Sequence, residues 1–140
     1  MKAGGIAKTG NRDKIEIFNL PVPIPSPGQV LVKMAAAPVN FIDTIIREGN
    51  MPPNMMPALP FVFGGEGSGV IADANNTELK KGQKVAFLGA IGASAYADYA
   101  VVDRDKLVVL DDNIDLNEAA VIPVNYFTAY HMLHNVAKVQ

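Results

Sequence analysis

The 140-residue sequence has no cysteine, no tryptophan and only two histidines. Without cysteine the chain forms no disulfide and offers no thiolate to a metal ion, which suits a cytoplasmic protein. Charged residues make up only 19% of the chain and the net charge is −2, so a basic surface for nucleic acid is not expected. These absences predict a cytoplasmic protein without a nucleic-acid partner.

Long apolar runs are also missing. No stretch approaches the length that a membrane-spanning helix needs, and the N-terminal segment MKAGGIAKTGNRDKIEIF lacks the apolar centre of a signal peptide. Hydrophobic residues still make up 49% of the sequence, which is enough for a folded domain with a buried core. We therefore expect a globular domain without membrane association.

Short apolar or alternating runs predict β-strands along much of the chain. They are MKAGGIA, KIEIFNL, QVLVKMAAA, KVAFLGA and AYADYAVVDRDKLVVL. Between the second and third runs lies PVPIPSPGQ, whose prolines forbid a helix and favour an extended connection. A linker between two domains is the alternative, but strands this close on both sides favour a connection within one barrel.

Three segments predict helices. In NFIDTIIREG, Asn40 is a suitable N-cap, Asp43 occupies the third helical position, and Gly49 ends the helix. DLNEAAVI predicts a short helix that ends at Pro123, and NYFTAYHMLHNVAKV predicts a longer one. The proline-rich segment NMPPNMMPALP predicts a loop. The expected architecture is a mainly antiparallel β-barrel followed by two helices.

The segment LPFVFGGEGSGVIADA contains the pattern G-x-G-x-x-A of dinucleotide-binding loops. Such a loop needs a helix directly after its glycines, because the pyrophosphate binds at the helix N-terminus. The following residues, GVIADANNTELKKG, instead show a β-branched run and a polar turn. The acidic residue expected about twenty positions later is missing as well. We interpret the match as coincidental.

Six blocks then occur in a consistent order. They are MKA, PGQVLVKMAAAPVNFIDTIIREG, LPFVFGGEGSGVI, LKKGQKVAF, ASAYADYAVV and EAAVIPVNYFTAYHML. Together they resemble the N-terminal GroES-like catalytic domain of the medium-chain dehydrogenase/reductases, and most closely the zinc-free quinone oxidoreductases of the zeta-crystallin type. The resemblance implies a partly open GroES-like β-barrel over residues 1–124. Residues 125–140 are then a connecting helix toward a Rossmann cofactor domain that lies outside this sequence.

The resemblance also implies the chemistry, which is hydride transfer from a nicotinamide to a quinone or an α,β-unsaturated carbonyl compound. NADPH or NADH is then bound mainly by the cofactor domain, and the sequence leaves the choice between them open. The family pattern places Asn40 and Asp43 on the nicotinamide-ribose side of the cleft, and Thr128 with Asn125 on its other wall. The GGEGSG glycines are expected to form a turn at the floor of this cleft and to pack strand on strand.

Zinc-dependent relatives carry a cysteine at the position of Asn40 and a histidine at the position of Gly65, so the resemblance implies a domain without zinc. Glu66 alone is not a sufficient ligand set. His131 and His134 lie three positions apart on a predicted helix, but no third ligand is evident. We interpret these histidines as packing or surface residues.

No catalytic residue is assigned. Ile45 and Met51 stand where many relatives have tyrosine, and in the enoyl thioester reductase branch the second tyrosine resembles a proton donor. We expect Tyr96, Tyr99 and Tyr130 to pack in the core. A further tyrosine, at position 126, is expected to narrow the cleft.

Two alternatives remain. One is a GroES-like structural or binding module without catalysis, although GroES has no counterpart to EAAVIPVNYFTAYHML. The other, within the enzyme class, is an enoyl thioester or alkenal reductase. In the family a later return segment completes the domain, so these 140 residues alone are expected to leave apolar surface open and to form a homo-oligomer. Little or no reductase activity is expected from them.

Overall fold

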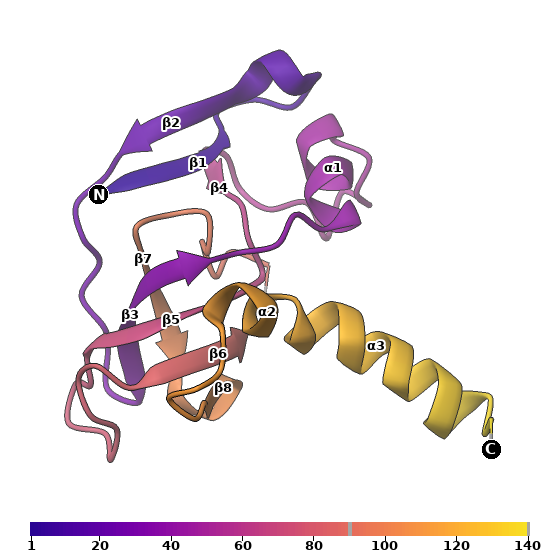
Figure 1. Ribbon diagram of the computed structural model, residues 1–140. Helices are drawn as coiled ribbons and strands as arrows, with labels where there is room; N and C mark the ends of the chain where they lie inside the picture. The colour runs from indigo at the N-terminus through magenta and orange to yellow at the C-terminus, as the bar shows by residue number, and fades with distance from the viewer. Residues whose placement is uncertain (90, 140) are drawn as a thin grey trace.

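The computed structural model describes residues 1–89 and 91–139. The chain forms two antiparallel β-sheets, from which a helical C-terminal segment projects (Figure 1). The first sheet has the order β2-β1-β4 and consists of β1 (Lys2–Ile6), β2 (Ile15–Asn19) and β4 (Phe61–Val62). The second has the order β7-β3-β5-β6-β8 and consists of β3 (Gln29–Ala36), β5 (Glu66–Asp73), β6 (Lys84–Leu88), β7 (Tyr99–Asp103) and β8 (Leu107–Val109).

Strands β1, β2, β3, β6, β7 and β8 coincide with the predicted runs, whereas β4 and β5 lie in the LPFVFGGEGSGVIADA segment, outside those runs. In β3 and β7 buried and more exposed residues alternate, as expected for strands with one face on a core. The last run divides into β7 and β8 around the short 3-10 turn η2 (Arg104–Lys106), and a similar turn, η1 (Arg12–Lys14), precedes β2. The larger core cluster lies in the five-stranded sheet, and the smaller one lies between the first sheet and the first helix. The first includes Val30, Val32, Ile71, Val85 and Phe87, and the buried residues of the second are Ile6, Ile46, Phe61 and Phe63. The mainly β, GroES-like barrel is confirmed.

The proline-rich segment between β2 and β3 joins the two sheets. It forms no ladder with a neighbouring strand, as its prolines predict. The side-chain amide of Asn75, in the turn after β5, donates to the backbone oxygens of Pro25, Ser26 and Gln29 at 3.1, 2.7 and 3.2 Å. The segment is therefore held against the barrel rather than extended between separate bodies.

Strand β5 contains the glycines of the G-x-G-x-x-A match, and no helix follows them. A Cβ atom on Gly69 would lie 2.2 Å from the backbone oxygen of Lys33 in β3. One on Gly67 would lie 2.8 Å from the oxygen of Ala36. The glycines therefore allow β3 and β5 to approach closely, and the interpretation of a coincidental motif is confirmed. The expected turn is shorter than predicted, since Glu66 already belongs to the strand and only Gly64 and Gly65 precede it.

Helix α1 (Phe41–Glu48) has the predicted ends. At its start the backbone N–H of Asn40 donates to Oδ2 of Asp43 at 2.9 Å, and Gly49 ends the helix in the left-handed conformation with φ of 78°. The methionine- and proline-rich residues that follow, 50–60, contain neither helix nor strand, as predicted.

The C-terminal helices differ from the prediction at Pro123. Helix α2 (Leu116–Ala120) is capped by the Asp115 side chain, but a new helical run already begins at Ile122. The run consists of a wide π turn η3 (Ile122–Tyr126), then α3 (Phe127–Tyr130), then a second π segment η4 (His131–Val136). Pro123 thus lies in the first turn of a helix, where its missing N–H is not needed. It does not end the preceding one.

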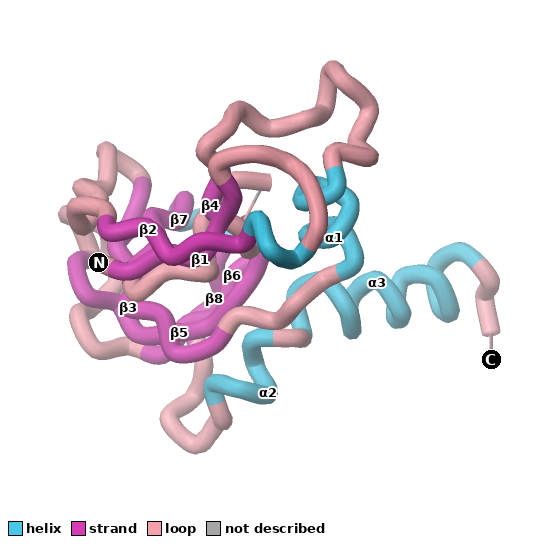
Figure 2. Tube along the Cα trace, turned by 90° about the horizontal axis from the view of Figure 1, so that it is seen from above, coloured by secondary structure: helices cyan, strands magenta, loops and turns pink. Residues whose placement is uncertain are grey.

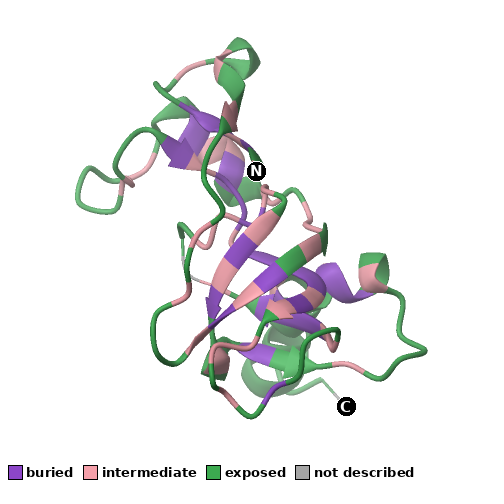
Figure 3. Ribbon diagram, turned by 90° about the vertical axis from the view of Figure 1, so that its left-hand side faces the viewer, coloured by how far each residue is buried: buried purple, intermediate pink, exposed green. Residues whose placement is uncertain are grey.

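This helical run points away from both sheets (Figures 1 and 2). In Figure 3 the buried residues lie mainly along the sheets, in α1 and in α2, whereas the run is exposed from Asn125 onward. From Tyr126 onward the large apolar side chains are at least half exposed; they are Tyr126, Phe127, Tyr130, Met132, Leu133 and Val136 in the run, and Val139 just after it. The prediction that Tyr130 packs in the core is therefore wrong for this chain, because nothing described here covers that part of the helix. None of the helices described is long and apolar enough to cross a membrane.

Candidate functional site

A buried carboxylate joins three separate segments of the chain. Glu66, the first residue of β5, is 0% exposed. Its Oε1 accepts a hydrogen bond from Nδ2 of Asn40 at 2.8 Å, and its Oε2 accepts the backbone N–H of Val124 at 2.7 Å. Within residues 1–89 and 91–139 no ion pair involves Glu66. The N–H donors therefore compensate the burial of this group.

Two of the predicted site residues meet at this carboxylate. Nδ2 of Asn125 lies 3.1 Å from Oδ1 of Asn40 and 3.4 Å from Oε1 of Glu66. Asn40 precedes α1, and Asn125 lies in the first turns of the C-terminal helical run. The fold thus places one side-chain amide from the barrel against one from the helix.

Asp43 supports this corner of the barrel, which is formed by Asn40, Glu66 and Asn125, from the interior of the protein. Its side chain is buried, and its Oδ2 accepts the backbone N–H of Asn40 at 2.9 Å. The hydroxyl of Tyr96 lies 2.8 Å from Oδ2 of Asp43 and 2.9 Å from the backbone oxygen of Pro38. Burial, together with the hydrogen bond to Asp43, raises the pKa of the Tyr96 hydroxyl far above its ordinary value of 10.0. Tyr96 is consequently a hydrogen-bond donor at neutral pH, and its hydroxyl has a hydrogen-bond partner as expected for a tyrosine that packs partly buried against the core.

Thr128, the fourth predicted residue, lies on α3 and is exposed. It follows Asn125 by three positions, so the two residues share one side of the helix. In the described part of the chain, no hydrogen bond joins the Thr128 side chain to the other three residues. The structure therefore brings Asn40, Asp43 and Asn125 together and leaves Thr128 on the neighbouring exposed turn.

The sequence reasoning considered Glu66 only as an insufficient zinc ligand and missed its role in this network. One signal was available, because Glu66 is the only acidic residue between Glu48 and Asp73, in a segment rich in glycine and apolar residues. A lone carboxylate in such a segment is buried only where donors are provided for it. The Val124 donor is a backbone group, so no side-chain pattern marks it.

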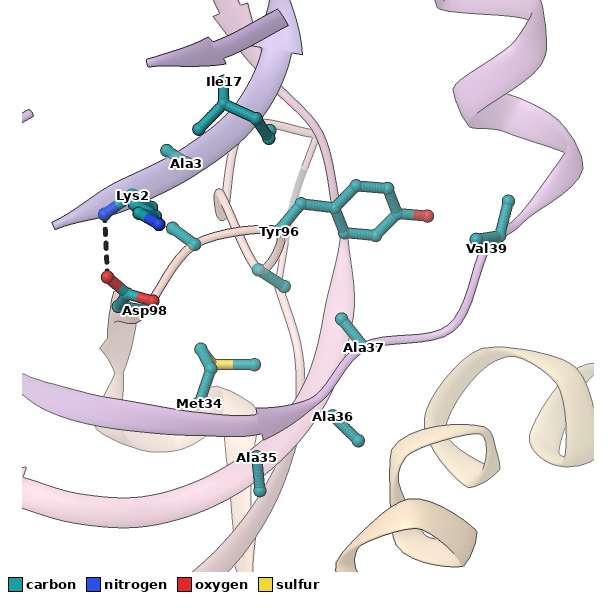
Figure 4. Close-up of a pocket in the computed structure, with 13 residues that line it drawn as sticks. Lys2, Ala3, Ile17, Met34, Ala35, Ala36, Ala37, Val39, Tyr96 and Asp98 are labelled. Carbon is teal, nitrogen blue, oxygen red and sulfur yellow. Dashed lines mark hydrogen bonds between the residues drawn. The ribbon is translucent and has the colours of Figure 1, made fainter. Parts of the chain in front are cut away.

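A hollow lies beside this network rather than at it. It measures about 650 Å³ and is lined by residues that include Lys2, Ile17, Met34 and Tyr96 (Figure 4). On one side the backbone N–H of Lys2 donates to Asp98 at 2.7 Å. Tyr96 borders the hollow with its ring, whereas its hydroxyl bonds to Asp43 and Pro38. Neither the two asparagines nor Glu66 lines this space.

No metal centre is found in the part of the chain that the structure describes, since no three His, Asp or Glu residues cluster there in a way that could hold an ion. Nδ1 of His131 lies 2.8 Å from Nδ2 of Asn135, and the His134 ring packs on Tyr130 with the ring centroids 4.5 Å apart. Both histidines are exposed. The zinc-free character of the site stays a prediction from the residues at positions 40 and 65.

Comparison with known proteins relates this geometry to a family. Residues 26–112, more than half of the chain, match the family model of the alcohol dehydrogenase GroES-like domain. The quinone oxidoreductase of Sus scrofa is 33% identical over 132 residues, which cover 92% of this chain and 39% of that protein.

Two solved structures have the same fold. The human synaptic vesicle membrane protein VAT-1 homolog-like protein superimposes with a TM-score of 0.91 at 29% identity, covering all of this chain and 45% of that one. The Escherichia coli quinone oxidoreductase complexed with NADPH gives a TM-score of 0.84 at 27% identity, covering 95% of this chain and 40% of that one. The chain spans less than half the length of these relatives. Its barrel, its two C-terminal helices and these matches show that the chain belongs to the alcohol dehydrogenase GroES-like domain family, in the quinone oxidoreductase, zeta-crystallin-like branch of the medium-chain dehydrogenase/reductases.

Proposed function

We propose that this chain is the N-terminal catalytic domain of a zinc-independent, NAD(P)H-dependent oxidoreductase that reduces quinones or related electron-poor carbonyl compounds. The observation that carries the proposal is the contact between the side-chain amides of Asn40 and Asn125 beside the buried Glu66. The family pattern has the nicotinamide-ribose side of its cleft at Asn40 and the other wall of the cleft at Asn125. The names of the matched relatives support the same class of reaction.

The chemistry of the donor set fits the nicotinamide end of the cofactor. Amides and a hydroxyl both donate and accept hydrogen bonds, as ribose hydroxyls and a carboxamide require. Both acidic side chains of the corner, Asp43 and Glu66, are buried and hydrogen-bonded within the protein. They therefore present no exposed negative charge to an anionic dinucleotide. Asn40, Asn125 and Thr128 would hold the ribose, and Asp43 would orient Asn40 from behind.

A bound reduced nicotinamide would supply the hydride for the reaction. This chain's residues would supply orientation, because they fix polar groups on one wall of the site before a ligand arrives. Zinc-independent chemistry is supported by Asn40 and Gly65, neither of which offers a nitrogen or sulfur ligand of the kind that catalytic zinc takes. Enoyl thioester or alkenal reduction is the alternative within this class, and Met51 in place of a tyrosine argues against the enoyl thioester branch.

Titration of the isotope-labelled chain with reduced nicotinamide mononucleotide tests the proposal. We expect NMR shift changes at Asn40, Val124 and Asn125, with Kd in the millimolar range because a mononucleotide offers only part of the contacts of the whole dinucleotide. Adenosine monophosphate, the other half of the dinucleotide, is the matched control and should leave these signals unchanged. Equal responses to the two nucleotides, or none at these positions with about 10 mM of either, would contradict the assignment.

Turnover provides a second test. We expect little or no reduction of a quinone by NADPH from the 140 residues alone, since the binding energy lost with the pyrophosphate site is about 4 kcal/mol. Measurable turnover would show that the chain needs no further domain. A non-catalytic binding module is the alternative supported by the exposed apolar side chains of the helical run, and it predicts no nicotinamide response at all. A homo-oligomer and a cytoplasmic location belong to the proposal as well.

A further inference from the structure

We propose that Glu66 is a positioning residue, which sets the direction of hydrogen bonding through Asn40 and Asn125 and so decides which kind of atom this pair offers to a ligand. The part of the inference that concerns the ligand rests on the proposed function. The part that concerns the protein does not.

The direction follows from the carboxylate. An ionised carboxylate accepts hydrogen bonds and donates none, and a backbone nitrogen donates and never accepts. Oε2 of Glu66 is taken by the N–H of Val124, so Oε1 faces Asn40. Asn40 must therefore turn its amide nitrogen toward Glu66, and its amide oxygen is left facing Asn125.

The same constraint passes on to Asn125. Because it meets the oxygen of Asn40, Asn125 turns its nitrogen inward, at 3.1 Å from that oxygen and 3.4 Å from Glu66. Its own Oδ1 receives no hydrogen bond from any residue in the ranges 1–89 and 91–139, and Asn125 is exposed. The pair consequently presents a hydrogen-bond acceptor. A ligand hydroxyl or primary amide matches it, whereas a carboxylate or phosphate does not.

Glu66 also fixes where the helical run leaves the barrel. Val124 lies in η3, directly after the buried Pro123, and every described residue from Asn125 onward is exposed. The bond from Val124 to Glu66 thus ties the last partly buried turn of the helix to the barrel. A single buried side chain controls both the direction of the amide pair and the placement of the helix that carries half of it.

A reversal of the pair provides the test. In Glu66→Gln, the oxygen of the new amide must accept the N–H of Val124, so its nitrogen faces the amide nitrogen of Asn40. Two donors then oppose each other unless the side-chain amides of Asn40 and Asn125 both rotate by half a turn. In Asn125→Asp, a second carboxylate faces the first.

The double variant Glu66→Gln/Asn125→Asp is consistent again, because the bonds among the side chains at positions 40, 66 and 125 are all reversed while position 66 still accepts the N–H of Val124. The new amide at position 66 donates to Asn40, and Asn40 donates to the new carboxylate at position 125. The second oxygen of that carboxylate remains an outward acceptor, and the net charge equals that of the parent chain. Glu16→Gln, on the exposed strand β2, is the control for the loss of a charge.

Two quantities are measured on the whole 140-residue chain, the hydrogen-exchange rate of the Val124 amide and the Kd for reduced nicotinamide mononucleotide. We expect each single variant to accelerate exchange and to weaken binding by about tenfold or more, as the loss of one charge-assisted hydrogen bond predicts. The double variant should return to within about threefold of the parent in the exchange rate, and it should bind the mononucleotide more tightly than Asn125→Asp, which carries the same exposed charge. The Glu16 control should leave both unchanged.

The outcomes separate the two claims. Parent-like exchange of Val124 in Glu66→Gln, or a double variant no better than the two single ones, overturns the positioning role. If both single variants unfold and the double variant folds, the compensation is supported; if all three unfold, it is refuted. If the exchange rates behave as expected but the parent binds no nicotinamide, the positioning role stands and the proposed function fails.

Discussion

Nδ2 of Asn125 lies 3.1 Å from Oδ1 of Asn40, although 85 positions separate the two residues in the sequence. The contact joins a helix that is otherwise exposed to a corner of the barrel whose own contacts are buried. Hydrogen bonds at this corner therefore act together with the buried Pro123 where the helical run meets the barrel. Substitutions in this corner are expected to act on both parts of the molecule.

Replacement of Glu66 by alanine should lower the free energy of unfolding by about 3 kcal/mol, because it leaves buried N–H donors without an acceptor and opens a cavity. Urea denaturation followed by circular dichroism measures the change. Glu16→Ala, on an exposed strand, should stay within about 0.5 kcal/mol of the parent. A loss below about 1 kcal/mol for Glu66→Ala would mean that solvent reaches these donors.

The close approach of β3 and β5 makes a second prediction. Gly69→Ala would place a methyl group 2.2 Å from the backbone oxygen of Lys33, so the strands must separate. We expect a loss of about 3 kcal/mol in the free energy of unfolding. At Gly4 the nearest atom to a new Cβ is 3.7 Å away, so Gly4→Ala is the matched control and should cost less than about 1 kcal/mol. Equal effects at the two sites would refute the packing explanation.

Tyr96 predicts how stability depends on alkaline pH. Its pKa is raised in the folded chain above the ordinary value of 10.0, first by burial and then by Asp43. The unfolded chain therefore loses this proton at lower pH than the folded one, so the contribution is complete below pH 10 and is lost as pH rises beyond it. Denaturation from pH 8 to 11 should show a steeper fall for the parent than for Tyr96→Phe. Parallel curves would indicate that the hydroxyl is solvated.

The exposed apolar side chains of the helical run predict self-association. Phe127 and Val136 are 57% and 69% exposed, respectively. The double variant Phe127→Glu/Val136→Glu should shift the chain toward monomer in sedimentation velocity experiments, because the added charges resist burial. Asn54→Glu/Asn113→Glu adds the same charge at exposed polar positions and should not do so. A parent chain that is monomeric at every concentration would disprove this prediction.

The fold was largely predictable because its signals are local. The strand runs, the caps of α1 at Asn40 and Gly49, and the absence of a helix after the β5 glycines each depend on residues a few positions apart. The wrong predictions arose at residues whose local sequence pattern is compatible with two different structures. Pro123 is compatible with the end of one helix or the start of the next, and the structure has the latter. Tyr130 was expected in the core because it lies on an apolar stripe, but a stripe does not show whether a partner covers it.

The sequence by itself determined which segments become strands and helices, and its ordered blocks identified the family, since hydrophobic period, turn residues and motif order are written along the chain. Only the tertiary structure decided that Glu66 accepts the N–H of Val124, 58 positions away, and that Asn40 meets Asn125. The physical reason is that these bonds form only once the barrel closes and brings distant segments together. The donor at Val124 is a backbone N–H, which every residue except proline has, so the sequence does not distinguish Val124 as the partner of Glu66.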